Sequence, residues 1–209
     1  MAFQIILNKL CMSRRTSHGE THLSLLEKPA FFFRKRRIRP FLHDCDVYVD
    51  LGCGFTATLL RWVVSEFKIK KAIGLDLSCN PALATEKISF QEGDLNNEIA
   101  LPDNSVDMIT SLAVLEHLSN ARKNLQEVYR ILKPGGRLVM TTPTPLSKPV
   151  LEFLSYKLGL INEDEVRDHK DYYNTIRLRE MLSSAGFVPE NIQAGVFLFG
   201  LNNFVLAIK

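Results

Sequence analysis

The sequence predicts an α/β fold built on a mainly parallel, doubly wound sheet. Three observations support this prediction. Strand-like and helix-like segments alternate after residue 46, a glycine-rich turn directly follows the first strand, and two β-rich runs near the C-terminus have no helix between them. Strands separated by helices form right-handed βαβ units whose sheet is covered on both faces. Two strands joined by a short loop form an antiparallel pair.

The strands are expected where short β-branched and apolar runs lie between turn signals. Five such runs precede the C-terminal pair. The expected strands are Val47–Leu51, Ala72–Asp76, Ile88–Gln91, Val106–Leu112 and Arg137–Thr141, and then the pair Phe187–Val196 and Asn203–Ile208.

The helices are expected where apolar residues recur with helical spacing. The expected helices are Thr56–Lys68, Leu115–Leu132, Pro149–Leu160 and Ile176–Ala185. The second should end at Lys133-Pro134-Gly135-Gly136, because a cation followed by Pro and Gly is typical of a helix end. Asn162–Lys170 is expected to be a polar connector. Residues 20–44 are expected to form helical segments broken near Pro29 and Pro40.

Composition indicates an ordinary globular protein. The chain has 209 residues, 46% of them hydrophobic and 23% charged, which suits one domain of roughly 150–200 residues and argues against a disordered chain. No apolar run approaches the length that crosses a bilayer. The four cysteines lack the paired spacing of a zinc site, so no metal is expected, and free thiols suggest a cytoplasmic protein.

The charge is unevenly placed. Residues 1–46 hold 9 Lys+Arg against 4 Asp+Glu, although the whole chain is only +3, and five basic residues lie within Arg34–Arg39. We expect residues 1–44 to form a basic, Phe-rich cap or arm, and residues 45–209 to form the main domain, with 146–173 as an insert beside the substrate. The basic run has three interpretations: a packed cap helix, a site for a phosphate-bearing or acidic acceptor, or a patch at a membrane surface. No nucleic-acid partner is expected, because the main domain is net acidic.

Glycines and acidic residues follow three successive strands. Gly52-Cys53-Gly54 lies between a strand and a helix, where glycine lets the backbone approach a ligand closely. Asp76 closes the second strand, where a carboxylate accepts hydrogen bonds from ribose hydroxyls. Gly93-Asp94-Leu95 follows the third strand and offers a carboxylate beside an apolar side chain. Together these positions predict a pocket for a nucleoside.

The ordered set of motifs resembles a known family. Asp50-Leu51-Gly52-Cys53-Gly54, Gly74-Leu75-Asp76-Leu77-Ser78, Gly93-Asp94-Leu95, Asp107 with Leu115-Glu116-His117, and Leu132-Lys133-Pro134-Gly135-Gly136 are similar to the motifs of class I S-adenosylmethionine-dependent methyltransferases. They are most similar to the small-molecule branch typified by ubiquinone and menaquinone biosynthesis enzymes. The resemblance covers about residues 45–145 and implies a Rossmann-like sheet of seven strands with an antiparallel last strand.

The resemblance also implies which residues bind S-adenosylmethionine. Asp50, Gly52, Cys53 and Gly54 would line its methionine part; Asp76 would hold the ribose and Leu77 the adenine; Asp94 and Leu95 would bound the adenine edge; Ser111 and Leu112 would approach the methionine part and the acceptor. One departure is Thr56, which stands where the family often has a third glycine.

Catalysis of methyl transfer depends mainly on in-line positioning of two bound reactants. A general base is needed only when the acceptor holds its proton tightly. His117 and His169 are the candidates, with Glu116 a weaker one; a packing or surface histidine is the alternative interpretation of each.

The expected function is methyl transfer to a small-molecule or lipid-linked acceptor, at oxygen or carbon, by a cytoplasmic protein with or without peripheral contact to a membrane. Two alternatives stay open. One is a non-catalytic S-adenosylmethionine-binding protein whose basic arm docks a partner. The other is an NAD-dependent oxidoreductase, which the missing G-x-G-x-x-G spacing disfavours.

Overall fold

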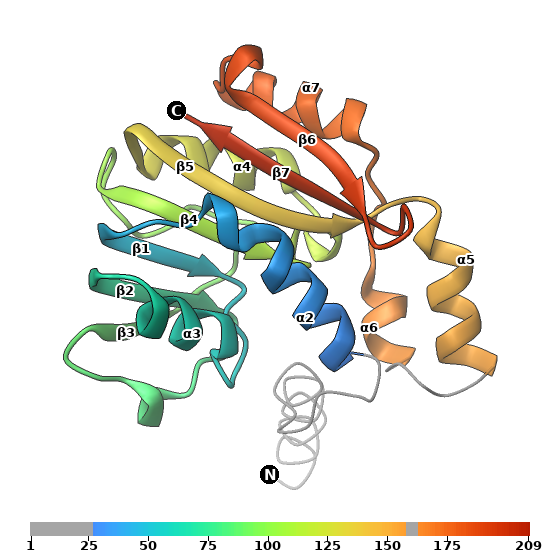
Figure 1. The fold of residues 1–209 in the computed structure, drawn as a ribbon, viewed down its shortest axis with the longest axis horizontal. Coiled ribbons are helices and arrows are strands. Elements are labelled where there is room, and N and C mark those ends of the chain that lie inside the picture. The colour runs from blue at the N-terminus through green and yellow to red at the C-terminus, as the bar shows by residue number, and fades with distance from the viewer. Residues whose placement is uncertain (1–26, 158–162) are drawn as a thin grey trace, which may run out of the picture.

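A seven-stranded sheet forms the centre of the computed structural model, which describes residues 27–157 and 163–209. The strand order is β3-β2-β1-β4-β5-β7-β6 (Figure 1). All pairings from β3 to β5 are parallel, and β7 runs antiparallel to both β5 and β6. The strands are β1 (Cys45–Leu51), β2 (Ile69–Asp76), β3 (Ile88–Glu92), β4 (Val106–Leu112), β5 (Leu132–Pro143), β6 (Ile192–Phe197) and β7 (Asn202–Ile208). The predicted doubly wound, Rossmann-like sheet is confirmed.

Helices cover both faces of the sheet, and each face has its own apolar core. In Figure 1, α2 (Glu27–Ile38) and α3 (Thr58–Glu66) lie in front of the sheet, whereas α4 (Ala121–Ile131) lies behind it. α4 shares its core with α7 (Thr175–Ala185), through side chains such as Leu125 and Leu182. The front core contains Ile38 of α2 and Leu60 of α3. Cover on both faces explains why β1 and β4 are buried over most of their length.

The helix expected at Leu115–Leu132 is wrong at both ends. A separate 3₁₀ turn, η3 (Leu115–His117), comes first, and α4 starts only after Asn120, whose side chain accepts a hydrogen bond from the Lys123 amide. At the other end, Leu132 already belongs to β5. The Pro-Gly run after it enters the strand instead of ending a helix, with a shift of register against β4. Gly135 takes a positive φ of 79° there, which is why glycine stands at that position.

The insert contains more helix than the sequence predicts. Instead of one helix from Pro149, the chain forms α5 (Ser147–Glu152) and a π-helical turn, η4 (Phe153–Lys157). The expected polar connector contains a short helix, α6 (Glu163–Asp168), which a polar sequence of this length does not reveal by apolar spacing. The end of the expected helix Pro149–Leu160 lies outside the described residues. α5 and α6 lie at the end of the sheet where β1, β4 and β5 finish (Figure 1).

The expected cap is described only from residue 27, so residues 1–26 of that prediction lie outside the described part. Pro29 lies in the first turn of α2 as described, so the break predicted near it stays a prediction, and the chain turns at Pro40 in a 3₁₀ helix, η1 (Arg39–Phe41). Two further 3₁₀ turns are η2 (Pro81–Leu83) and η5 (Pro189–Asn191). None of the described helices combines the length and apolarity needed to cross a bilayer.

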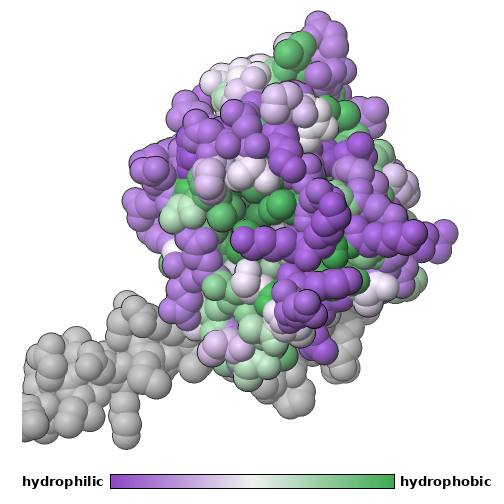
Figure 2. Space-filling model, turned by 90° about the vertical axis from the view of Figure 1, so that its left-hand side faces the viewer, coloured by the Kyte–Doolittle hydropathy of each residue, from purple (hydrophilic) through white to green (hydrophobic). Residues whose placement is uncertain are grey.

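The two ends of the parallel strands differ in character. Figure 2 shows the end at which these strands begin; it is covered mainly by hydrophilic residues, with apolar ones visible only between them. The opposite end gathers the loops after β1, β2 and β4, because parallel neighbours finish at the same edge. Ligands of open α/β sheets bind at this carboxyl edge, at the point where the strand order changes direction. Here that point lies between β1 and β4.

Candidate active site

The two glycines of the loop after β1 differ in the space around their Cα atoms. Gly52 has a φ of 70°, and a Cβ placed on it would lie 2.3 Å from Cγ2 of Val114. Gly54 has a φ of 67°, but a Cβ there would meet no atom within 4 Å. The first glycine therefore allows the loop to pack against the residue before η3, and the second leaves the backbone open to a ligand.

Asp50 is a buried carboxyl at the end of β1, with 1% of its surface exposed. Its Oδ1 accepts a hydrogen bond of 2.6 Å from the Thr110 hydroxyl, whereas its Oδ2 has no hydrogen-bond partner among the described residues. Burial raises the pKa of Asp50 to about 7, although the Thr110 hydrogen bond acts in the opposite direction. A buried oxygen without a partner is costly, and a cationic ligand group would compensate for it.

Asp76 lies next to the open glycine. Its Oδ2 accepts a 2.8 Å hydrogen bond from the Gly54 amide, which connects the end of β2 to the loop after β1. The next residue, Leu77, leaves 64% of its surface exposed, an unusual position for a large apolar side chain. A carboxylate and an apolar side chain at adjacent positions suit a ribose and a base.

Cys53 points into the protein. It is buried, and its Sγ would lie 2.9 Å from a Cβ on Gly74, so β2 needs glycine at that position. Burial raises the pKa of both the Cys53 and the Cys79 thiol, which keeps them protonated. Cys53 therefore packs beneath the loop, and only its backbone is placed to face a ligand.

The residues after β3 and β4 are placed less favourably for direct contact. Asp94 is exposed, and its oxygens accept hydrogen bonds from the Asn96 amide and from the Asn97 side chain. Leu95 is buried in the core behind the sheet. Ser111 and Leu112 end β4 at the same edge as the glycine loop, Ser111 buried and Leu112 half-buried. Their roles toward a cofactor stay predictions.

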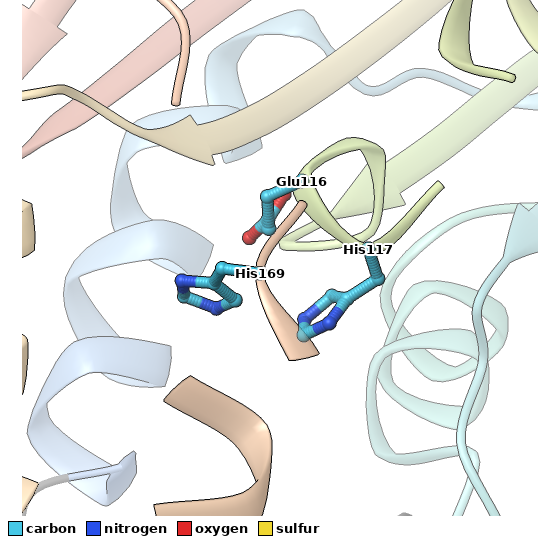
Figure 3. Close-up of side chains that lie close together, drawn as sticks. All are labelled: Glu116, His117 and His169. Carbon is cyan, nitrogen blue, oxygen red and sulfur yellow. The ribbon is translucent and has the colours of Figure 1, made fainter. Parts of the chain in front are cut away.

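The two histidines proposed from the sequence come together in the structure. His117 in η3 and His169 after α6 have ring centroids 4.8 Å apart, at an interplanar angle of 72°. Glu116 joins them, and one ligand atom from each of the three side chains lies within 4.8 Å of the others (Figure 3). We call Glu116, His117 and His169 the polar cluster. The sequence predicts no metal, and residue spacing gives no sign of this grouping.

Each member of the polar cluster is held by a further side chain. His117 Nδ1 lies 3.1 Å from Oδ2 of Asp168, and His169 Nδ1 lies 2.9 Å from the Tyr172 hydroxyl. The Thr142 hydroxyl donates a 2.9 Å hydrogen bond to Oε2 of Glu116. No sequence pattern assigns a role to these three partners. Asp168 and Tyr172 flank His169 in sequence, and this is the signal that could have found them.

Burial controls the charge of the polar cluster. It lowers the pKa of His169 to about 4, assisted by the positive charges of His117 and Arg34. It raises the pKa of Glu116, which is 1% exposed. At neutral pH, His169 is therefore an uncharged imidazole with a nitrogen able to accept a proton.

Most of the basic run is engaged within the protein. The Lys35 ammonium lies 4.7 Å from the centroid of Trp62, and the Arg37 guanidinium lies 4.3 Å from the centroid of Phe204. Arg39 forms an ion pair with Glu66 at 3.1 Å. Arg34 is near enough to influence Glu116 and His169, which places α2 beside the polar cluster.

Comparisons with known proteins agree with this geometry. A family model described as a methyltransferase domain matches residues 49–140. A probable S-adenosylmethionine-dependent methyltransferase of Mycolicibacterium smegmatis is 28% identical over 190 residues, which cover 86% of this chain and 67% of the relative. The ubiquinone/menaquinone biosynthesis C-methyltransferase UbiE of Psychromonas ingrahamii is 32% identical over 126 residues, covering 53% of this chain and 48% of the relative.

Solved structures share the fold. An S-adenosylmethionine-dependent methyltransferase from Mesorhizobium loti has a TM-score of 0.66 at 19% identity, with 84% of this chain and 98% of that chain covered. This chain thus spans about two thirds of the first curated relative and about half of the second. The family model, the relatives and the strand order together make this chain similar to the class I S-adenosylmethionine-dependent methyltransferases.

Proposed function

We propose that this chain transfers a methyl group from S-adenosylmethionine to an oxygen or carbon atom of a small-molecule or lipid-linked acceptor. The observation that carries the proposal is the contact between two parts of the site. Val114, which precedes Glu116 and His117, packs against Gly52 of the glycine loop. A proton-accepting cluster thus lies directly beside the loop at which the family's cofactor binds.

The residues at the glycine loop fit the cofactor. When bound, S-adenosylmethionine supplies a methyl group activated by a positively charged sulfur. The Oδ2 of Asp50, which has no hydrogen-bond partner among the residues that the structure describes, suits the positive charge of the methionine part. The open backbone at Gly54 gives the ligand room, and Asp76 with Leu77 suits the ribose and the adenine. These assignments are the ones predicted from the sequence, and cofactor binding by variants at these positions tests them.

The polar cluster suits an acceptor that must lose a proton. His169 is uncharged at neutral pH, because burial lowers its pKa to about 4. In the tautomer whose Nδ1–H donates to the Tyr172 oxygen, Nε2 is the nitrogen that accepts the proton. Asp168 orients His117 in the same way. A hydroxyl or an acidic C–H group is the kind of acceptor for which such a base is useful. Alignment of acceptor and methyl group supplies the larger part of the acceleration.

The two alternative functions are less well supported. The matched family and its relatives are methyltransferases, which disfavours an NAD-dependent oxidoreductase. A docking arm requires basic side chains that are available to a partner, but Lys35, Arg37 and Arg39 contact the protein itself. The same contacts favour the packed-cap interpretation of the basic run over a phosphate site or a membrane patch.

Calorimetry and a labelled methyl donor test the proposal. The protein is titrated with S-adenosylmethionine, then incubated with the labelled donor and with aqueous and lipid fractions of a cell extract. We expect binding of one cofactor per chain and label in a small molecule or lipid. Absence of binding by folded protein contradicts the proposal. Binding without label in any fraction supports the non-catalytic alternative instead.

A further inference from the structure

The polar cluster has the donor set and the supporting contacts of a metal site. Its donors are two imidazoles and one carboxylate, the combination that holds zinc in several hydrolases and iron(II) in non-haem oxygenases. Ligand atoms of Glu116, His117 and His169 all lie within 4.8 Å of one another. Figure 3 shows the three side chains gathered in one space between η3 and the segment after α6.

The contacts outside the cluster are those that orient metal ligands. A histidine that binds a metal through one ring nitrogen commonly engages a carboxylate or another polar group through the other. Here Nδ1 of His117 lies 3.1 Å from Asp168, and Nδ1 of His169 lies 2.9 Å from the Tyr172 hydroxyl. Each ring would therefore bind an ion through its Nε2. Thr142 holds the carboxylate of Glu116 through Oε2.

We propose that Glu116, His117 and His169 bind one divalent transition-metal ion such as Zn²⁺. Three protein ligands leave at least one coordination position for another donor. With bonds of about 2.1 Å, tetrahedral ligand atoms lie roughly 3.4 Å apart, so the side chains must close by on the order of 1 Å around the ion. Rotations about the side-chain bonds would have to provide this closure.

Arg34 opposes the binding of a cation without removing a ligand atom. Its charge acts on both Glu116 and His169. A cation in the site would favour the ionised form of the buried Glu116 carboxyl, and this attraction opposes the repulsion from Arg34. The three ligands and two orienting contacts are the reason to expect binding despite Arg34.

The consequence for the acceptor rests on the proposed function. The remaining position of the ion would lie at the carboxyl edge beside the glycine loop, where an oxygen of the acceptor could occupy it. A metal ion lowers the pKa of a bound hydroxyl, so the acceptor hydroxyl would release its proton to water and the alkoxide would then attack the methyl group, without a histidine base. Acceptors with a metal-binding oxygen are then the preferred class, and methyl transfer would depend on the ion.

Cobalt(II) serves as the probe, because its absorption bands report nitrogen and oxygen ligands. Full-length protein freed of metal by a chelator is titrated with Co²⁺ and, in competition, with Zn²⁺. We expect one ion per chain, a loss of affinity of about 100-fold or more in His169→Ala and Glu116→Gln, and unchanged affinity in His43→Ala, a histidine outside the cluster. Equal affinity in wild type and His169→Ala, or no binding by folded wild type at about 1 mM metal, overturns the proposal.

Tyr172→Phe keeps the test decisive if a ligand variant does not fold. It retains all three ligands and removes only the partner of His169, so we expect a roughly 10-fold loss of affinity; unchanged affinity overturns the assignment. S-Adenosylmethionine binding is measured on the same samples. If wild type binds S-adenosylmethionine but not the metal ion, this inference alone is refuted. If folded wild type does not bind S-adenosylmethionine, the proposed function is refuted.

Discussion

The glycine loop at residues 50–54 and the polar cluster are linked through Val114, which packs against Gly52 just before η3, yet the chain builds them in different ways. The loop is one continuous segment whose backbone angles and small residues determine its shape. The polar cluster combines a turn after β4 with a segment after α6, and depends on Thr142 of β5. A loop that binds through its backbone is therefore sensitive to added atoms, whereas a cluster assembled from separate segments is sensitive to the loss of a partner.

Gly52→Ala should have the largest effect and tests the loop. A Cβ would lie 2.3 Å from Val114 on a backbone with a φ of 70°, so strain and overpacking combine to roughly 2–6 kcal/mol of lost stability. Urea unfolding measures the loss. Gly54→Ala is the matched control: its φ of 67° is similar, but nothing lies within 4 Å. We expect it to cost only about 1–2 kcal/mol. Equal losses in the two variants would show that packing against Val114 does not matter.

Asp50 predicts a dependence of stability on pH. Burial raises its pKa from the ordinary value of 3.8, which it has in an unfolded chain, to about 7 in the folded protein, so the folded state holds the extra proton between these values. Stability from this group is therefore greatest at low pH and falls as the pH rises toward 7. Between pH 5 and pH 8, wild type should lose about 2–3 kcal/mol more than Asp50→Asn. Urea unfolding of cofactor-free protein at the two pH values measures the difference, and parallel curves would refute it.

Asp76→Ala tests whether cofactor affinity depends on the residues around the glycine loop and not on the polar cluster. Loss of charged hydrogen bonds to the ribose should weaken S-adenosylmethionine binding by about 10–100-fold, which corresponds to roughly 1.5–3 kcal/mol. Calorimetry measures the affinity. Tyr172→Phe, which alters a partner of the polar cluster, should bind the cofactor as wild type does. If both variants bind equally well, Asp76 does not hold the ribose.

The sequence predicts the loop better than the polar cluster, and the reason is physical. Local sequence signals predict the loop. Gly52 and Gly54 allow the positive φ values that the turn requires, and Asp76 is the last residue of β2. The sequence proposes His117 and His169 separately, but their proximity depends on how α6 packs, and α6 has no apolar periodicity that marks it. The helix expected from Leu115 is wrong because Asn120 caps α4 later in the chain. Tertiary packing, which a local pattern cannot show, assembles the cluster.

The smallest expected effect concerns α2, which places Arg34 beside the polar cluster. If the basic run is part of the folded core, Arg37→Ala should lower the free energy of unfolding by about 1 kcal/mol, because the guanidinium lies 4.3 Å from the Phe204 ring centroid. Arg36→Ala removes the same charge from an exposed position and should change stability by less than about 0.5 kcal/mol. Thermal unfolding of the two variants measures the difference. Equal, negligible effects would instead show that α2 is held without Arg37, and would leave its basic residues available to an outside partner.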